Sequence, residues 1–522
     1  MQRVRYHIDS MEDSAPDTTG SKAASDKSSR FPLLFHWGLN RRQTALLAGI
    51  LLLTTLAFLR TLNNGFVYDD FPALVRNARL RHWSFIWDSL TRDVWWYYAM
   101  AHPPESSYYR PIQNVCLGLG FQLAGLHAAG WHFLKILLHL SVVLAVFRLA
   151  QLLTANTVIG LLVALLFALM PSNGAAVISI QAMGEPLAAG FAMGSLSVFI
   201  RRSSTGWRGT AIAMILFAFA AFSHETAVLF PLLVAVYVFL FETGSELRGE
   251  PAPLTARIGQ SILSSAPFFV VAMLYIGARA LVLGPEGTFG LMPHKLYVGG
   301  TPVPVSLFQP HPLFTSAQIL MTIPTVLVHY VELLIFPWMA EPSHDVNGVM
   351  APSFSELFVP LGILALLALT GYLIFRNSPR AKLYLFCAIW WFVSLAPAFS
   401  FNHIVAFVQD RYLYLASFAF CLWVGTWLID FVGDSVVRSR AVAVAVAALI
   451  AFDIAKLWRL EPIWHDNLRL FTRCVDDFPD SPYYHRILAS TLMKNGDFAA
   501  AAGHLRYIYK PKTEENKKDN VK

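Results

Sequence analysis

The stretch 45-ALLAGILLLTTLAFL-59 decides the fold, and 65-GFVYDDFPALVRN-77, which follows it, raises the first question about function. The first stretch is an apolar run that is typical of a membrane-embedded segment. The adjacent acids Asp69 and Asp70 are therefore expected at the membrane surface, among aromatic and apolar residues. Ionised carboxylates are costly there unless something uses them. Both acids are candidate functional residues.

The composition of the chain is that of a polytopic membrane protein. Of its 522 residues, 56% are hydrophobic and 14% are charged, whereas soluble domains carry about 25% charged residues. The formal charge of +7 indicates contact with anionic lipid or phosphate, and no nucleic acid is expected as a partner. The four cysteines form no CxxC pair, which argues against a zinc ribbon or a redox pair.

Twelve apolar segments are candidate spans, and the basic loops between them set the orientation. Lys and Arg are concentrated in short loops, which we expect in the cytoplasm. The loops at 60–113 and 341–355 are expected outside, the second because it carries no Lys or Arg. The candidate spans are 44–59, 131–150, 156–171, 174–200, 208–223, 226–242, 259–283, 317–338, 356–375, 382–398, 412–432 and 439–458.

These loops agree on one orientation only if the segment 317–338 does not cross the membrane fully. That segment contains Pro324, His329, Glu332 and Pro337, which suit a re-entrant or interfacial helix buried in protein. The sequence therefore predicts an all-α protein with about eleven transmembrane helices, a re-entrant or interfacial helix and an outside C-terminus. The alternative is that another helix is divided wrongly.

The two ends of the chain differ from its centre. Residues 1–43 predict a disordered cytoplasmic tail, and residues 511–522 a second disordered tail. Residues 459–510 regain charge, and 482-PYYHRILASTLMKNGDFAAAAGHLRYIY-509 predicts two helices joined at Asn495-Gly496-Asp497. This hairpin resembles one tetratricopeptide repeat, although ordinary helical hairpins share the pattern. It is expected to cap the membrane domain or to dock a protein partner.

The first outside loop, 60–113, combines acids with an aromatic cluster at 95-WWYY-98. Trp and Tyr favour the membrane–water interface, so we expect the loop to lie on the membrane. Asp70 precedes Phe71-Pro72 and suits a helix N-cap without chemistry. This structural role does not explain Asp69. If both acids are buried, their repulsion raises the pKa of one of them, as a general base requires.

Several fragments in a fixed order resemble one known family. They resemble the transmembrane and tetratricopeptide-repeat O-mannosyltransferases and their bacterial relatives, which belong to the GT-C superfamily of glycosyltransferases. The resemblance covers about 44–510, with 44–458 as the GT-C-like membrane domain. Two positions depart from the family, because His224 stands where Lys is usual and Glu185 where Asp is usual. The fragments are 67-VYDD-70, 109-YRP-111, 130-GWHFLKILLH-139, 166-LFALMPSNGAAVISIQAMGEPLA-188, 223-SHETAVLFP-231, 333-LLIFPWMAEPSHDV-346 and 410-DRYLYLAS-417.

The resemblance implies the transfer of a sugar, with mannose suggested by the family name, from a polyprenyl-phosphate-linked donor. The acceptor would be an extracytoplasmic hydroxyl of a protein Ser/Thr or a glycan. Asp69 or Asp70 matches the acidic motif of the family, with Asp69 favoured as the base and Asp70 as a cap or second acid. Arg110 and Arg411 would hold the phosphate, because guanidinium binds it bidentately.

Three further charged residues have two interpretations each. Glu185 is either a substrate-binding residue or a polar group paired inside the bundle. Lys135 lies between His132 and His139 at i, i+3 and i+7 positions and either meets the donor phosphate or belongs to a polar stripe. Glu225 either binds substrate or stabilises a turn with the preceding His224.

No motif for a metal or another cofactor is present. The chain has no DxD, no HExxH and no GxSxG sequence, so we expect a metal-independent mechanism. Two rival functions remain open: a transporter or lipid flippase, and a non-catalytic membrane scaffold. Transporters often have two matched halves, and no second copy of the acidic loop occurs. The expected location is a bacterial plasma membrane, or the endoplasmic reticulum membrane if the protein is eukaryotic.

Overall fold

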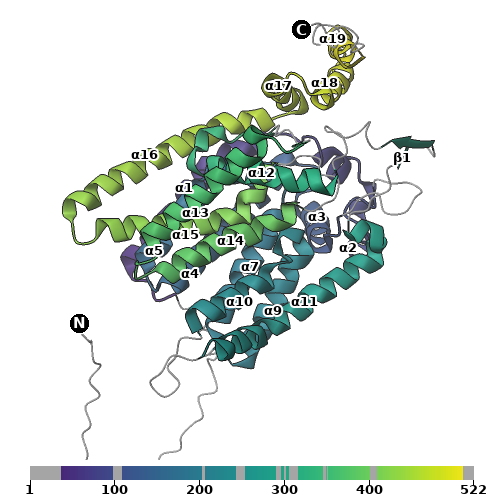
Figure 1. Ribbon diagram of the computed structural model, residues 1–522. Helices are drawn as coiled ribbons and strands as arrows, with labels where there is room; N and C mark the ends of the chain where they lie inside the picture. Colours follow the sequence, from purple (N-terminus) through teal and green to yellow (C-terminus); the bar gives the residue numbers. More distant parts are fainter. Residues whose placement is uncertain are drawn as a thin grey trace, which may run out of the picture. The chain divides into compact units, whose positions relative to one another are not determined.

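The computed structural model describes residues 37–97, 108–202, 206–242, 253–289, 295–298, 301–304, 315–344, 349, 351–399 and 408–509 (Figure 1). The predicted disordered tails lie outside these residues, except for 37–43. Within that part the prediction needs a correction, because helix α1 (Arg41–Phe58) already begins at Arg41. Asn40 and Gln43 form a capping box, in which each side chain accepts the backbone N–H of the other residue.

Nine helical stretches of the described residues are long and apolar enough to cross a membrane. They are Arg41–Asn63, Ala128–Thr154, Glu225–Glu242, Leu254–Gly284, Ser316–Ile335, Phe354–Phe375, Ala381–Phe399, Asp410–Val432 and Val436–Trp464. A tenth is possible if Thr157–Leu169 and Pro171–Ile178, which meet at a bend of 59°, count as one span. Two shorter apolar helices are α7 (Gly184–Ile200) and α9 (Trp207–Ser223).

The main helices within these stretches pack side by side in the bundle (Figure 1). Helix α4 packs against α5 and α7, α7 against α9, α10 against α11, and α14 against α15. Their bounds are α4 (Ala128–Thr154), α5 (Thr157–Leu169), α6 (Gly174–Ile178), α10 (Phe230–Tyr237), α11 (Leu254–Phe289), α12 (Ser316–Ile335), α13 (Val359–Phe375), α14 (Ala381–Leu395), α15 (Leu413–Val432) and α16 (Val436–Leu460).

The predicted number of about eleven spans exceeds the nine or ten that the structure supports by length and composition. All twelve predicted segments contain helix, but the apolar residues at 156–200 are divided among shorter pieces. The chain breaks at Met170-Pro171, because proline cannot continue a helix hydrogen-bond ladder, and it breaks again at 179–183, between α6 and α7. The segment expected to be re-entrant forms one continuous helix, α12, with Pro324 inside it.

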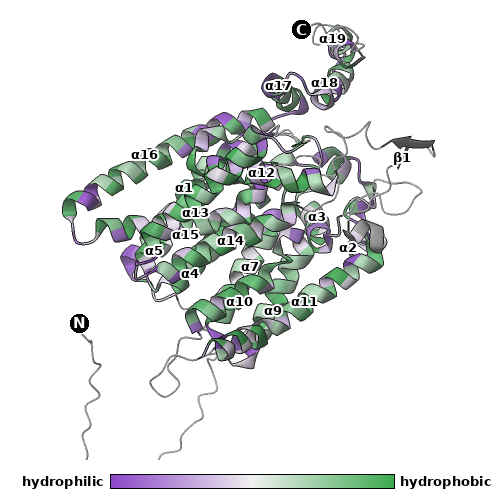
Figure 2. Ribbon diagram, viewed as in Figure 1, coloured by the Kyte–Doolittle hydropathy of each residue, from purple (hydrophilic) through white to green (hydrophobic). Residues whose placement is uncertain are grey.

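Hydrophobic residues cover the long helices, while hydrophilic residues gather at helix ends and in the C-terminal helices (Figure 2). Only 6% of the apolar window at Phe354–Phe375 is buried inside the protein, and 17% of that at Val436–Trp464. Exposed apolar faces of this extent need contact with lipid, because exposing them to water would cost free energy. The helical bundle is therefore that of a polytopic membrane protein.

One small element departs from the predicted all-α fold. Strands β1 (Lys295–Val298) and β2 (Thr301–Pro304) form an antiparallel hairpin between α11 and α12. Lys295 pairs with Pro304, and Val298 with Thr301. The hairpin belongs to a connection and leaves the helical bundle unchanged.

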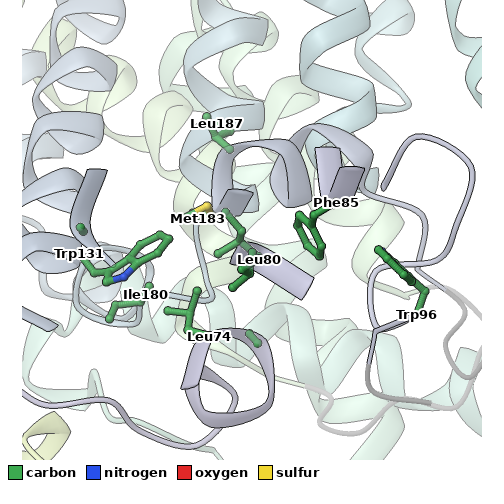
Figure 3. Close-up of a cluster of buried hydrophobic side chains, with 11 residues drawn as sticks. Leu74, Leu80, Phe85, Trp96, Trp131, Ile180, Met183 and Leu187 are labelled. Atoms are coloured by element: carbon green, nitrogen blue, oxygen red, sulfur yellow. The ribbon is translucent and has the colours of Figure 1, made fainter. Parts of the chain in front are cut away.

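The described part of the first loop is folded onto the bundle. It contains η3 (Phe71–Val75), η4 (Ala78–Arg81) and α2 (Ser84–Ser89), and it leads to α3 (Pro111–Ala124). A cluster of buried apolar side chains joins these elements to α4 and to the segment before α7 (Figure 3). Its members include Leu74, Leu80, Phe85, Trp96, Trp131, Ile180, Met183 and Leu187. This packing fixes the position of the loop that carries Asp69 and Asp70.

The C-terminal region forms the expected helical hairpin and one helix before it. These are α17 (Asn467–Asp477), α18 (Pro482–Lys494) and α19 (Phe498–Tyr509), and α18 packs against both neighbours. Gly496 has φ +86 in the turn between α18 and α19, a conformation that glycine adopts without strain. The tetratricopeptide assignment of this region stays a prediction.

We expect Gly120→Ala to destabilise the loop cluster. A Cβ at Gly120 would lie 2.6 and 2.7 Å from two ring atoms of Trp131, which is fully buried. Overpacking of this kind costs about 1–3 kcal/mol, so the thermal unfolding midpoint in detergent should fall by several degrees. Gly371→Ala in α13 is the matched control, since nothing lies within 4 Å of its added Cβ. Equal midpoints for the two variants would contradict the described packing.

Candidate active site

A cavity of about 300 Å³ lies where the first loop, α3, α7, η6 (Glu225–Ala227) and η12 (Asp410–Tyr412) meet. Five of the seven predicted site residues line it: Asp69, Arg110, Glu185, Glu225 and Arg411. Asp70 and Lys135 do not line it. Its other described lining residues are mainly aromatic and amide side chains, among them Tyr68, Trp95, Tyr108, Gln113, Gln181, His224 and Tyr412.

Asp69 faces the cavity with a free carboxylate. Among the described residues, no group donates a hydrogen bond to its side chain, whereas its backbone carbonyl accepts from Ala73 N at 3.1 Å. Partial burial raises the pKa of Asp69 to about 6, and the Arg411 guanidinium opposes that rise. An unpaired carboxylate with this proton affinity can take a proton from a group bound in the cavity.

Asp70 points away from the cavity and is buried. Its Oδ2 accepts from Val67 N at 3.1 Å, and its Oδ1 accepts from Gln181 N at 3.2 Å. The proposed N-cap bond is absent, since the side chain makes no cap contact with η3. Burial raises the pKa of Asp70 to about 7, while the two backbone N–H groups oppose the rise. Asp70 thus ties the first loop to the segment before α7.

Arg110 and Glu225 form a two-point ion pair on the cavity wall. Arg110 Nε donates to Glu225 Oε2 at 2.8 Å, and Nη2 donates to Oε1 at 2.5 Å. The guanidinium also lies over the Tyr108 ring, 4.5 Å from its centroid. Arg110 immediately precedes Pro111, the first residue of α3, so the start of this helix fixes its backbone.

Arg411 is held less tightly than Arg110. Its Nε lies 3.3 Å from Glu185 Oε1, within ion-pair distance. The Nε–H group nevertheless donates no hydrogen bond to this oxygen. His224 stands between the two acids of the wall, with Nε2 3.6 Å from Glu185 Oε1 and 3.9 Å from Glu225 Oε1. The cavity therefore combines three carboxylates and two guanidiniums around one imidazole.

His224 and two amide side chains on the cavity wall were not predicted as site residues. The sequence indicated a turn role for His224, and its Nδ1 indeed accepts from Thr226 N at 3.3 Å, while its Nε2 faces the acids. Gln113 Nε2 donates to Gln181 O at 3.2 Å. The side-chain oxygens of Gln113 and Gln181 are buried with no hydrogen-bond partner in the described chain. No sequence signal marks these amides, because the fold alone brings them together.

Lys135 lies behind the cavity wall. Its Nζ donates to Ala182 O at 2.8 Å and its side chain is buried. His139 also faces the protein interior, where Nδ1 contacts Tyr414 Oη at 2.6 Å and Nε2 contacts Ala168 O at 3.0 Å. Neither Lys135 nor His139 lines the described cavity, and both interpretations of Lys135 stay predictions.

A second polar cluster fixes the residue next to Arg411. Asp410 Oδ1 lies 2.5 Å from His344 Nε2, and Oδ2 accepts from Glu341 N at 3.2 Å. Although burial opposes its protonation, the Asp410 carboxylate raises the pKa of His344. The His344 side chain is buried in this cluster. The cluster anchors η12 and thereby Arg411.

The described residues contain no group of three His, Cys, Asp or Glu side chains that could hold a metal ion. The metal-independent mechanism stays a prediction. The described lining of the cavity combines the Asp69 carboxylate, which accepts no hydrogen bond from a described residue, with two guanidiniums and the unpaired side-chain oxygens of Gln113 and Gln181. Such a set can remove a proton, hold an anion and accept hydrogen bonds from hydroxyl groups.

The comparisons with known proteins agree with this chemistry at the level of distant homology. No family model matches the chain. Over 249 residues, 47% of the chain, it is 24% identical to the Homo sapiens protein O-mannosyl-transferase TMTC3, of which the match covers 26%. Over 210 residues, 40% of the chain, it is 28% identical to the Drosophila melanogaster protein O-mannosyl-transferase Tmtc1, of which 24% is covered. The chain is thus a distant homologue of these proteins and spans about a quarter of their length, which confirms the resemblance noted in the sequence.

Two solved structures match most of this chain at low sequence identity. The apo oligosaccharyltransferase of Archaeoglobus fulgidus has 13% identity and a TM-score of 0.42, with 86% of this chain and 60% of that one covered. ArnT from Cupriavidus metallidurans, bound to undecaprenyl phosphate, has 12% identity and a TM-score of 0.41, with 89% and 75% covered.

We expect opposite stability effects from removing the two aspartates. The raised pKa of Asp69 means that the folded state binds its proton more tightly, so stability falls as pH rises from about 4 through about 6. Asp69→Asn should remove this loss and raise the free energy of unfolding by about 1 kcal/mol at pH 7.5, a value reduced for solvent screening. Below pH 4 the difference should vanish.

Asp70→Ala should instead lower the unfolding midpoint at every pH, because the N–H groups of Val67 and Gln181 lose their acceptor. Each unsatisfied buried donor costs about 1–3 kcal/mol. Thermal unfolding in detergent between pH 4 and pH 8 measures both variants. A stabilised Asp70→Ala protein, or a destabilised Asp69→Asn protein, would contradict the assigned environments.

Proposed function

We propose that this chain is an integral-membrane glycosyltransferase that moves a sugar from a polyprenyl-phosphate-linked donor to a hydroxyl acceptor on the extracytoplasmic side. The observation that carries the proposal is the Asp69 carboxylate, which has no hydrogen-bond donor among the described residues and lines the same cavity as Arg411. The distant homology to protein O-mannosyl-transferases supports mannose as the sugar and a protein hydroxyl as the acceptor. A glycan acceptor is the alternative.

The proposed reaction needs one base and one anion site. The acceptor oxygen forms a bond with the anomeric carbon of the sugar, and the bond from that carbon to the phosphate oxygen breaks. Asp69 takes the proton of the acceptor hydroxyl, and polyprenyl phosphate leaves with the bonding electron pair. With a pKa of about 6, Asp69 is ionised at neutral pH and still basic enough to act.

Arg411 is the better phosphate ligand of the two guanidiniums. Arg110 already makes two hydrogen bonds with Glu225, and a phosphate would have to displace both. Among the described residues, Arg411 makes an ion-pair contact with Glu185 and a looser contact with the Tyr412 ring, 5.9 Å from its centroid, and its Nε donates no hydrogen bond. We therefore assign phosphate binding to Arg411, with Arg110 and Glu225 as a clamp between α3 and η6.

The other side chains of the cavity suit a sugar. Trp95 and Tyr412 offer aromatic faces for the apolar side of a pyranose ring. The unpaired oxygens of Gln113 and Gln181 can accept hydrogen bonds from its hydroxyl groups. The location in a bacterial plasma membrane, or in the endoplasmic reticulum membrane of a eukaryote, remains part of the proposal.

We further propose eleven crossings, with α12 as an interfacial helix. The first loop and the C-terminal helices touch, since Tyr68 N donates to Asn467 Oδ1 at 2.7 Å, so both lie on one side of the membrane. The chain starts on the opposite side of the membrane, and its last span ends on the side of the first loop. The number of crossings is therefore odd. Twelve apolar segments then leave one that does not cross.

The contacts of α12 support it as that segment. Tyr330 Oη accepts from N of the cavity residue Gln409 at 3.4 Å, and Thr325 Oγ1 donates to Glu356 O, near the start of the next apolar stretch, at 2.7 Å. Beyond the end of α12, His344 pairs with Asp410. Within α11, Tyr275 Oη donates to Tyr109 O at 3.2 Å, so this part of the helix lies beside the end of the first loop.

We expect Asp69→Asn to abolish sugar transfer from a polyprenyl-phosphate-mannose donor to a Ser/Thr peptide by purified protein in nanodiscs. In the wild type, activity should rise with pH through about 6 and then level off, because the base must lose its proton first. Arg411→Ala should slow transfer by a factor of about 10²–10³, the loss typical of one charge-stabilising donor. Arg208→Ala, an exposed cation elsewhere, is the control. Donor movement across the bilayer without transfer would favour the flippase alternative instead.

The topology is tested by impermeant maleimide labelling of single cysteines on intact cells. We expect Thr315→Cys and Trp338→Cys, which flank α12 at exposed positions, to react from the same side as Trp83→Cys in the first loop. Asn377→Cys, in the basic loop between α13 and α14, should react only after permeabilisation. Labelling of positions 315 and 338 from opposite sides would show that α12 crosses.

A further inference from the structure

The residues just before Asp69 are held from outside the membrane domain by the C-terminal helices. Gly65 N donates to His465 O at 2.9 Å, and a Cβ at Gly65 would lie 3.1 Å from that oxygen. Asn64 Nδ2 donates to Glu461 O at 3.0 Å, a buried contact. Two consecutive residues of the first loop are therefore bonded to the chain around the end of α16.

Tyr68 is the most closely held residue of this segment. Its backbone N donates to Asn467 Oδ1 at 2.7 Å, and its hydroxyl lies 2.5 Å from the Tyr483 hydroxyl. Its ring meets the edge of Phe471 at a centroid distance of 5.5 Å. Val67 beside it is buried in an apolar cluster with α17 and α18, which includes Leu470, Phe471, Cys474, Leu488, Ala489 and Leu492.

The backbone of Tyr68 shows that these contacts impose a conformation. Its φ is +47, in the left-handed region that a bulky side chain rarely adopts. Such residues persist only where the surroundings over-determine them. Here α17 and α18 supply the surroundings, and the left-handed turn lets Val67 face the tail while Asp69 faces the cavity.

We infer that α17 and α18 position the base of the active site, with Asn467 and Tyr483 as positioning residues that act on Asp69 through Tyr68. This inference rests on the proposed function of Asp69. It gives the C-terminal region a role within the chain itself: Asp70 fixes the loop from the bundle side, and the tail fixes it from the other side. Tyr68 itself belongs to the lining of the cavity.

Hydrogen exchange of the full-length protein in nanodiscs tests the geometry without any substrate. We expect Asn467→Ala and Tyr483→Phe to accelerate exchange in a peptide spanning 65–70 at least about fivefold, since each removes one anchor. Asn467→Asp keeps an acceptor oxygen for Tyr68 N and should restore protection. The matched controls are Asn495→Ala, at an exposed turn, and Tyr507→Phe, whose hydroxyl bonds Asp480 within the tail.

Transfer kinetics test the consequence. In Asn467→Ala and Tyr483→Phe we expect kcat to fall about fivefold or more at unchanged KM for the donor and unchanged unfolding midpoint, while Asn467→Asp and both controls keep normal kcat. Unchanged exchange at 65–70 overturns the inference whatever the activity. Accelerated exchange with normal kcat overturns it too. A wild-type protein that transfers no sugar overturns the proposed function alone, because the exchange experiment still decides whether the tail holds the loop.

Discussion

The structure depends on one buried carboxylate, that of Asp70. It accepts N–H groups from Val67, three residues before it, and from Gln181, 111 residues after it. A carboxylate with two backbone donors holds both segments at fixed distance, because losing either donor would leave buried polar groups unpaired. Asp69 is covalently adjacent, so its direction follows from this bond pair. The acid with no proposed chemistry therefore determines where the acid with proposed chemistry points.

The same principle explains the pairing of the other charges around the cavity. An isolated guanidinium or carboxylate taken out of water costs several kcal/mol, so each buried charge needs a partner even when no substrate is present. Glu225 neutralises Arg110 and Glu185 lies beside Arg411. The two pairings differ in strength. This difference is why we propose the Arg110–Glu225 pair as a structural clamp and Arg411 as the residue that exchanges Glu185 for a phosphate.

The sequence predicted the helices well because a membrane-spanning helix needs a long run of apolar residues. Such a run is a local feature and can be recognised without knowledge of the fold. The residues that line the cavity were predicted only through a family resemblance, since no local sequence pattern relates residue 69 to residue 411. The sequence could not show which way each side chain points. Asp69 and Asp70 are chemically identical neighbours, and they differ in that Asp70 accepts the N–H groups of Val67 and Gln181. Likewise, the face of α4 that carries Lys135 was apparent, but not that Ala182 O would occupy its ammonium.

Asp69 is then the one cavity carboxylate without an ion pair or a hydrogen bond among the described residues, and this exception has a physical meaning. Glu185 and Glu225 keep their charge because cations compensate it, which makes them poor proton acceptors. Asp69 has only the longer-range field of Arg411, and its pKa of about 6 reflects the balance between that field and burial. A general base needs a carboxylate whose charge is not neutralised by a cation, so that its proton affinity stays high. Its pKa must still lie below the working pH, so that the group is ionised before it reacts. A hydrogen-bond donor on Asp69 would stabilise the ionised carboxylate and lower its basicity, so the free side chain and the tightly anchored backbone around it are two parts of one requirement.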